Sequence, residues 1–178
     1  TAVAKELPSL ALEKARFTAE IREGEWRVSG VDVVDLLFSA NHGEELRALG
    51  KVVSGGELSR FMLALKAVSA KDETSKVLVF DEVDAGIGGE AADRVGAKLR
   101  GLSDHAQILC VTHLPQIATY GTTHYRVKKM TVNDRTTATV DRLDDEARTA
   151  EVARMMTGTR LSDAVLQTAR ELLEGEHQ

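Results

Sequence analysis

An apolar run that ends in two adjacent carboxylates constrains this chain more than any other feature. Residues Val77 to Phe80 are all apolar, and Asp81 and Glu82 follow them directly. Four apolar residues in a row indicate a strand buried on both faces, as in a parallel sheet. A buried strand has no structural need for two acids at its end, because an unpaired buried carboxylate is costly. The pattern predicts that both acids lie at a sheet edge and serve a cation or a phosphate-bound water.

A second apolar strand follows at the spacing of a βαβ unit. After the Gly-rich segment 84–89, the sequence predicts a helix over about residues 90–102 and a strand over residues 107–112. Two strands joined in this way run parallel with a right-handed crossover. Asp81 and His113 should then leave the same carboxyl edge, where α/β proteins bind ligands. A lone histidine is more often structural, but this position favours a hydrogen bond between His113 and a terminal phosphate.

The remaining patterns surround this unit with helices and antiparallel strands. Apolar residues at helical spacing predict an amphipathic helix over residues 57–71. We expect an α/β fold with a partly parallel sheet flanked by helices, plus antiparallel β-strands. The other expected elements are strands at 15–22 and 26–39 around a turn at 23–25, a short helix at 114–120, a hairpin of strands 125–130 and 136–143, and helices at 146–156 and 162–174.

Two explanations compete for the segment Ser54-Gly55-Gly56-Glu57. Serine with glutamate three residues later forms a capping box at the start of a helix. Each glycine in a first helical turn costs on the order of 1 kcal/mol relative to alanine, so two glycines suggest that a ligand approaches the backbone closely. Free amides and the positive helix end favour a phosphate there. From these four residues alone, capping and phosphate binding explain the pattern equally well.

Asp81 and Glu82 suit two different tasks. A salt-bridged strand end is the plain structural interpretation, but the position after a buried strand argues against it. Asp81 can hold Mg²⁺ directly or through water. Glu82 can turn toward an attacking water as a general base or orienting group.

Composition limits the size of the core and the classes of protein to which the chain can belong. With 178 residues, 43% of them apolar and 29% charged, the chain has room for one sizeable core, or a core with a small appendage. Cys110 is the only cysteine, which excludes an internal disulfide framework and favours a buried core thiol. No apolar run could span a bilayer, so we expect a cytoplasmic protein without membrane contact. The net charge of -5 argues against a surface wholly committed to nucleic acid.

These features resemble, in this order and at these separations, the ABC-type ATPases. Ser54 to Glu57 looks like the ABC signature, Val77 to Glu82 like the Walker B segment, Asp84 like the D-loop acid and His113 like the switch histidine. Within that superfamily, residues 51–60, 81–89 and 112–118 are similar to the RecN family, the SMC-like proteins of bacterial DNA double-strand-break repair. The resemblance covers most of residues 15–157.

The chain departs from that family pattern at one point. No Gly-x-x-x-x-Gly-Lys-Ser/Thr occurs, and the nearest candidate, Gly50-Lys51-Val52, lacks the first glycine and the hydroxyl residue. In the resembled family this Walker A loop lies in an N-terminal segment, separated by a long coiled coil. The resemblance therefore implies that residues 15–178 are the C-terminal part of an ATPase head, and that residues 1–14 are the helical return from the coiled coil.

The resemblance also implies a mechanism and its participants. ATP, with Mg²⁺ at Asp81, would be held between two heads of a homodimer, and the engaged protein would hold DNA. Glu82 and His113 would be catalytic toward the nucleotide on their own head, with Asp84 and Gln116 at the nucleotide site. Ser54, Gly55 and Gly56 would grip the γ-phosphate of the other head's ATP. A transporter cassette fragment and a non-hydrolysing dimerisation module are the alternatives.

Overall fold

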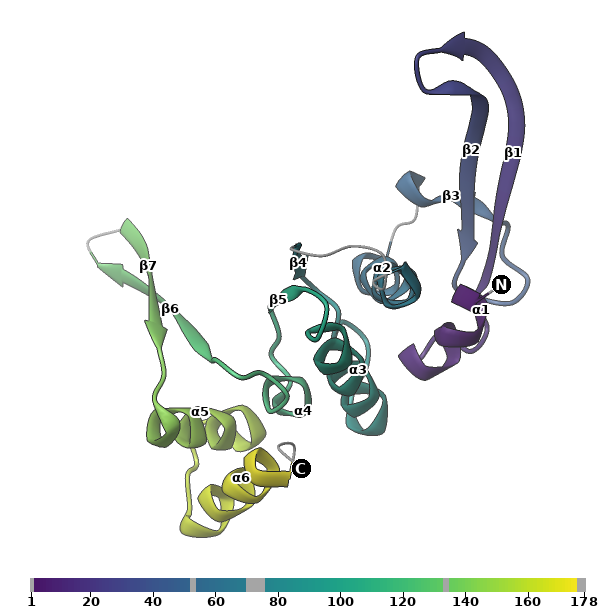
Figure 1. The fold of residues 1–178 in the computed structure, drawn as a ribbon. Coiled ribbons are helices and arrows are strands. Elements are labelled where there is room, and N and C mark those ends of the chain that lie inside the picture. The colour runs from purple at the N-terminus through teal and green to yellow at the C-terminus, as the bar shows by residue number, and fades with distance from the viewer. Residues whose placement is uncertain (1, 52–53, 70–75, 133–134, 176–178) are drawn as a thin grey trace.

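The computed structural model describes residues 2–51, 54–69, 76–132 and 135–175, and its elements follow one another as an open chain of small units (Figure 1). No helix in these ranges is long and apolar enough to cross a membrane. The α-helices are α1 Ala2–Glu6, α2 Gly55–Ser69, α3 Gly89–Leu102, α4 Pro115–Ala118, α5 Asp145–Thr157 and α6 Asp163–Gly175. The strands are β1 Arg16–Arg27, β2 Gly30–Ser39, β3 Arg47–Ala48, β4 Val77–Phe80, β5 Gln107–Cys110, β6 Tyr125–Val132 and β7 Arg135–Arg142, and short 3-10 turns lie at Leu7–Leu10 and Leu49–Lys51.

The first strands form a long antiparallel hairpin whose turn lies later than expected. β1 continues through Glu23-Gly24-Glu25, with an irregularity in its pairing with β2 between Glu23 and Arg27. The chain reverses at residues 28–29, before Gly30 with a φ of 114°. The predicted turn at 23–25 is therefore wrong. A Cβ on Gly24 would lie 2.6 Å from a methyl group of Val33 on β2, so this glycine allows a close approach of two strands and does not mark a turn. β3 pairs with β2 and was not predicted.

The βαβ unit has the predicted topology. β4 pairs with β5 in parallel, from Val77 opposite Gln107 to Phe80 opposite Cys110, and α3 connects them. The two strands are shorter than the sequence pattern suggested. The acids after β4 and the histidine segment after β5 consequently leave the same edge of this small sheet.

The expectation that β4 is buried on both faces is wrong for this chain. Val77 and Val79 are 56% and 65% exposed, whereas Phe80 is 5% exposed. Leu109 of β5 and Val111 directly after β5 are also exposed. The helices cover one face of the sheet, and no element of the described residues covers the other. An uncovered parallel sheet is unusual, because such sheets are normally packed on both faces.

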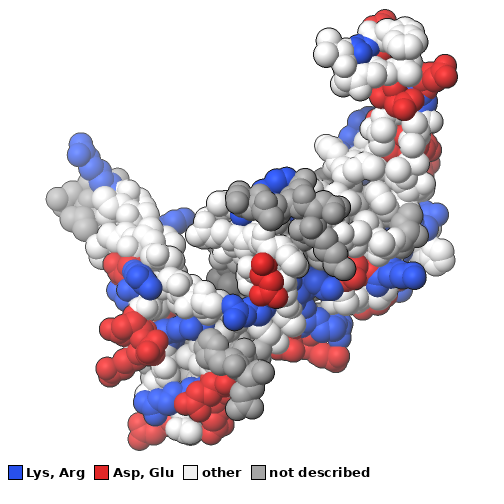
Figure 2. Space-filling view, in the orientation of Figure 1, with Lys and Arg blue, Asp and Glu red and all other residues white. Residues whose placement is uncertain are grey.

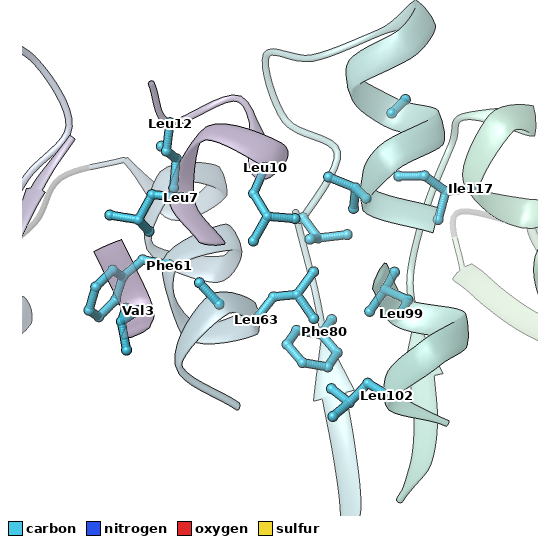
Figure 3. Close-up of a cluster of buried hydrophobic side chains, with 14 of the residues drawn as sticks. Val3, Leu7, Leu10, Leu12, Phe61, Leu63, Phe80, Leu99, Leu102 and Ile117 are labelled. Atoms are coloured by element: carbon cyan, nitrogen blue, oxygen red, sulfur yellow. The ribbon is translucent and has the colours of Figure 1, made fainter. Parts of the chain in front are cut away.

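The main core joins the first residues of the chain to the helices around β4 (Figure 3). Leu7 and Leu10 are 2% and 0% exposed, and Phe61 and Leu63 of α2 are fully buried beside them. Phe61 stacks at a tilt on Phe38, with ring centroids 4.7 Å apart. Residues 1–14 were predicted to lead into the main body, and residues 2–12 of that segment contribute to its core.

The C-terminal part has a smaller core of its own. Val152 and Ala153 of α5 pack against Ala169 and Leu173 of α6. The predicted hairpin is present as β6 and β7, although its expected turn at 133–134 lies outside the described residues. This hairpin stands apart from the central elements (Figures 1 and 2). Arg126 at its base reaches Glu151 of α5, with 3.6 Å between nitrogen and oxygen.

Candidate nucleotide site

The two acids lie at the carboxyl edge of β4, as the sequence predicted, and both are exposed. The backbone N–H of Glu82 donates to Asp81 Oδ1 at 2.9 Å. Glu82 adopts a left-handed φ of 57°, a conformation that usually costs a non-glycine residue of the order of 1 kcal/mol. Residues Glu82 to Ala85 then form a turn. A 3.0 Å hydrogen bond from the Ala85 N–H to the Glu82 carbonyl oxygen closes it. The backbone thus changes direction sharply directly after the strand.

The signature-like segment packs against this turn at its two glycines. α2 begins at Gly55, and a Cβ on Gly55 would collide with Glu82 Oε2. A Cβ on Gly56 would lie 2.7 Å from the Ala85 Cβ and 2.9 Å from the Ala85 carbonyl oxygen. Gly56 therefore has a structural reason that the sequence did not reveal, which is the close approach of the helix to the turn. At Gly55 the neighbouring atom is the end of the Glu82 side chain, which can move away.

Ser54 also fits the capping interpretation. The Glu57 N–H points to Ser54 Oγ at 3.4 Å, a long hydrogen bond, and the Leu58 N–H donates to the Ser54 carbonyl at 3.1 Å. Ser54 and Gly55 are exposed and Gly56 is buried, so capping leaves only the first two residues accessible to a ligand. Capping and phosphate binding remain compatible at this helix end.

Arg60 ties α2 to the same turn from inside the protein. Its side chain is 4% exposed, and Nη1 donates to the carbonyl oxygens of Val83 and Ala85 at 3.3 and 2.7 Å. Burial lowers the pKa of the Arg60 guanidinium, while Glu57 and Asp84 oppose this change. Because a guanidinium remains charged at neutral pH, Arg60 places a buried positive charge next to Asp84.

Asp84 connects the turn after β4 to the segment after β5. Its side chain is 5% exposed, and Oδ2 accepts from the Thr112 hydroxyl at 2.6 Å and from the His113 backbone N–H at 2.8 Å. His113 Nδ1 lies 2.8 Å from the same oxygen. The structure thus brings together Asp84 and His113, two of the residues that the sequence singled out. A direct role of Asp84 in nucleotide binding stays a prediction.

The charge state of Asp84 follows from these contacts. Burial alone would raise the pKa of its carboxyl, but the hydrogen bonds from Thr112 and from the His113 N–H outweigh burial and lower the pKa overall. Asp84 is therefore a buried carboxylate at neutral pH. By contrast, burial and the neighbouring acids Asp84 and Asp81 raise the pKa of the Cys110 thiol to about 12, which agrees with an inert core thiol.

His113 and Gln116 differ in accessibility. The His113 side chain is 75% exposed although Nδ1 is held by Asp84. Gln116 lies in the short helix α4, and its Oε1 is buried without a hydrogen-bond partner among the described residues. The role of Gln116 in nucleotide binding stays a prediction.

Asp81 can supply one carboxylate ligand for Mg²⁺, and the described residues around it form no complete cage. No cluster of three or more His, Cys, Asp or Glu side chains able to hold a metal ion occurs within residues 2–51, 54–69, 76–132 and 135–175. Mg²⁺ commonly takes one or two carboxylates and fills its other positions with water and substrate phosphates. An exposed carboxylate at a sheet edge fits that coordination, and Asp81 would be the residue that holds the ion.

Sequence reasoning missed Thr112 and gave Arg60 little weight. Thr112 Oγ1 donates to Asp84 and accepts the Leu114 N–H at 3.1 Å, so both functions of its hydroxyl are used. A hydroxyl residue directly before the histidine was the available signal for Thr112. For Arg60 the signal was a cation among the apolar residues on the buried face of the predicted helix; Arg60 is the sixth residue of α2.

Similar proteins were found by sequence, although no protein-family model matches the chain. The DNA repair protein RecN of Halalkalibacterium halodurans is 39% identical over 175 residues, which is 96% of this chain and 31% of that protein. RecN of Vibrio cholerae is 41% identical over 173 residues, again 96% and 31%. RecN of Bacillus subtilis is 36% identical over 190 residues, 98% of this chain and 33% of that protein. The chain thus spans about a third of the length of these relatives.

Solved structures show the same fold at low sequence identity. The Smc head domain with a coiled coil and joint from Pyrococcus yayanosii matches 88% of this chain and 29% of its own, with a TM-score of 0.58 and 18% identity. The Smc head domain with an extended coiled coil from Pyrococcus furiosus, bound to the C-terminal domain of ScpA, matches 99% of this chain and 38% of its own, with a TM-score of 0.53 and 17% identity. The chain has the fold of part of an SMC head domain and is homologous, over nearly its whole length, to about a third of the DNA repair protein RecN.

Proposed function

We propose that this chain is the C-terminal half of an SMC-like ATPase head that acts in DNA double-strand-break repair in the bacterial cytoplasm. The observation that carries the proposal is the edge of the β4–β5 sheet, where Asp81, Glu82 and the Asp84-held His113 lie together with the glycine-rich start of α2. Two acids and a histidine at one sheet edge suit phosphoryl chemistry, and the helix N-terminus beside them suits a second phosphate.

The residues divide the work on ATP in the following way. Asp81 holds Mg²⁺, which neutralises the charge that develops on the phosphates. Glu82 orients the attacking water and accepts its proton, and His113 contacts the terminal phosphate. Gln116 helps to arrange the water at the same nucleotide. Ser54, Gly55 and Gly56 present backbone amides to the γ-phosphate of an ATP mounted on a second head.

A segment outside this chain must supply the phosphate-holding loop. The sequence lacks a Walker A motif, and the β4–β5 sheet leaves Val77, Val79, Leu109 and Val111 exposed. We propose that the N-terminal segment of the same protein carries the Walker A loop and packs on this apolar face. Burial of that face would complete the sheet and supply a favourable term of about 25 cal/mol for each Å² of apolar surface.

Contact with DNA is proposed for the full-length protein and not for a particular surface of this chain. On the face shown in Figure 2, Lys and Arg side chains are spread among acidic side chains and do not gather in one patch. The net charge of -5 agrees with this distribution. Engagement of two heads through ATP, and their release after hydrolysis, would hold and free DNA.

The substitution Glu82→Gln tests this function in the full-length protein. Gln keeps the shape of the side chain but cannot accept a proton, so we expect at least about a tenfold lower ATP turnover. ATP should still bind, and the variant should form a more persistent ATP-dependent dimer in light scattering. Glu174→Gln, an exposed acid on α6, is the matched control and should behave as the wild type.

Three outcomes separate the alternatives. Unchanged turnover in Glu82→Gln would remove Glu82 from the catalytic role. A wild-type protein that dimerises with ATP but never hydrolyses it would favour the dimerisation module. A transporter cassette is disfavoured by the RecN relatives, and activation of turnover by DNA, not by a membrane partner, would argue against it further.

A further inference from the structure

We propose that Asp84 and Thr112 form a buried anchor that fixes which nitrogen of His113 faces the nucleotide. Asp84 is then a positioning residue that acts through His113 and does not itself touch ATP. The inference rests on the proposed function and deepens it, because it assigns a task to the one buried carboxylate at the site.

The geometry of the anchor carries the proposal. A single carboxylate oxygen, Asp84 Oδ2, meets the Thr112 hydroxyl, the His113 backbone N–H and His113 Nδ1 within 2.6 to 2.8 Å. The first two contacts fix the backbone of the segment after β5, and the third fixes the rotation of the ring. Thr112 also accepts the Leu114 N–H, which joins the anchor to the start of α4.

The chemistry of imidazole then decides what the ring presents. Nδ1 must carry a hydrogen to donate to a carboxylate, so the contact selects the Nδ1–H form. Nε2 is left on the exposed part of the ring, whose side chain is 75% accessible. To donate to a phosphate oxygen as well, the ring must carry a hydrogen on both nitrogens, as an imidazolium does.

The surroundings of Asp84 support a permanent carboxylate at this place. Arg60 donates to the carbonyls of Val83 and Ala85 on either side of Asp84, and it is itself 4% exposed. The turn that carries Asp84 is therefore held by α2, and the segment that carries His113 is held by Asp84. A movement of α2 on contact with a second head would therefore change the position of His113.

A double-mutant cycle in the full-length protein tests the positioning role. kcat and KM for ATP are measured for Asp84→Asn, His113→Ala and the double variant. Loss of a partner that orients a functional side chain typically costs roughly 10- to 100-fold in activity, so we expect that loss in kcat for Asp84→Asn with KM for ATP changed less than about twofold. In the His113→Ala background, Asp84→Asn should change kcat less than about twofold.

Equal losses from Asp84→Asn in both backgrounds would overturn the proposal, because they would show that Asp84 acts independently of His113. Thr112 gives a second series should Asp84→Asn fold poorly. Thr112→Ser keeps the hydroxyl and should retain turnover, whereas Thr112→Val should lose it, and equal turnover of the two would contradict the anchor. Asp104→Asn, at an exposed turn acid, is the control.

A spectroscopic readout separates this inference from the proposed function. In protein labelled with ¹⁵N-histidine, long-range ¹H–¹⁵N spectra report which ring nitrogen bears hydrogen, and the His113 signal is identified by its loss in His113→Ala. We expect Nδ1–H in the wild type and loss of that preference in Asp84→Asn. Nδ1–H without any ATP turnover would refute the proposed function alone, and Nε2–H in an active wild type would refute the anchor alone.

Discussion

At the scale of single residues, Gly56 shows how two demands meet at one position. Its Cα faces the turn after β4, where a side chain would lie 2.7 Å from the Ala85 Cβ and 3.1 Å from the Glu82 carbonyl oxygen. Real Cβ atoms do not approach other atoms this closely, so any larger residue pushes α2 away from the turn. The proposed function also places the backbone amide of Gly56, which is buried in this chain, at a phosphate.

Gly56→Ala should therefore destabilise the protein by about 1–3 kcal/mol, because the first turn of α2 must shift to avoid the overlap. The measurement is the denaturant midpoint of unfolding at an unchanged slope. Gly101→Ala, in the last turn of α3, is the matched control because nothing lies within 4 Å of its ideal Cβ. We expect Gly101→Ala to be neutral or stabilising by up to about 1 kcal/mol. Equal effects of the two changes would contradict the packing argument.

At the scale of elements, Glu151 connects α5 to the β6–β7 hairpin. Hydrogen bonds from Arg154 lower the pKa of the Glu151 carboxyl against the opposing effect of burial, and Arg126 adds to the lowering. A lowered folded-state pKa stabilises the protein above the ordinary value of 4.5. That stabilisation is lost as the pH falls through 4.5 and then through the lower folded-state pKa.

Glu151→Gln removes this contribution and takes the anion from Arg154, whereas Arg126 keeps Asp141 at 3.8 Å. We expect the variant to be less stable than the wild type at pH 7 by about 1–3 kcal/mol. The difference should shrink as the pH falls below about 4.5, because the carboxyl of the unfolded wild type protonates there, whereas the folded carboxyl, with its lowered pKa, protonates only at lower pH. Urea unfolding at several pH values measures it, with exposed Glu146→Gln on the same helix as the control. A pH-independent difference would contradict the linkage.

The sequence predicted the regular elements well because periodicity is a local signal. Helix α3, the parallel β4–β5 pair and the β6–β7 hairpin all lie within a few residues of their predicted positions. The errors arose where distant parts of the chain meet. Gly24 was assigned to a turn because its contact with Val33 on the opposite strand has no signature in a local pattern.

In the candidate site, too, the sequence predicted the positions that follow from local signals and missed the contacts between distant residues. The acids after β4 and His113 after β5 were placed at one sheet edge from strand order alone, and the structure has them there. The bonds that join Asp84 to Thr112 and Arg60 to the turn cross 28 and 25 residues of sequence. Such contacts depend on how loops close in three dimensions, and no spacing rule in the sequence contains them.

At the scale of the whole molecule, the uncovered face of the β4–β5 sheet is the feature that points to a missing segment. Val79 is 65% exposed in the middle of β4, where a parallel sheet is normally buried. Val79→Ser should leave the stability of this chain nearly unchanged, because the side chain already meets solvent. It should weaken binding of the separately produced N-terminal segment by about tenfold, since burial of the valine side chain is worth about 1.5 kcal/mol or more.

Isothermal titration between the two segments measures this effect. Leu161→Ser is the control, because Leu161 is also exposed, at 47%, but lies between α5 and α6. Equal affinities of wild type and Val79→Ser would show that the β4–β5 face is not the surface that the N-terminal segment covers.

The central claim is that the acids and the glycine-rich start of α2 on one head serve different ATP molecules. It is tested by mixing two inactive full-length variants, Ser54→Arg and Glu82→Gln, and measuring ATP turnover. In a mixed dimer, Glu82 of the first variant and Ser54 of the second meet at one intact site. Random pairing into dimers should then restore about a quarter of wild-type turnover. Turnover of the mixture no higher than that of the separate variants would contradict the claim.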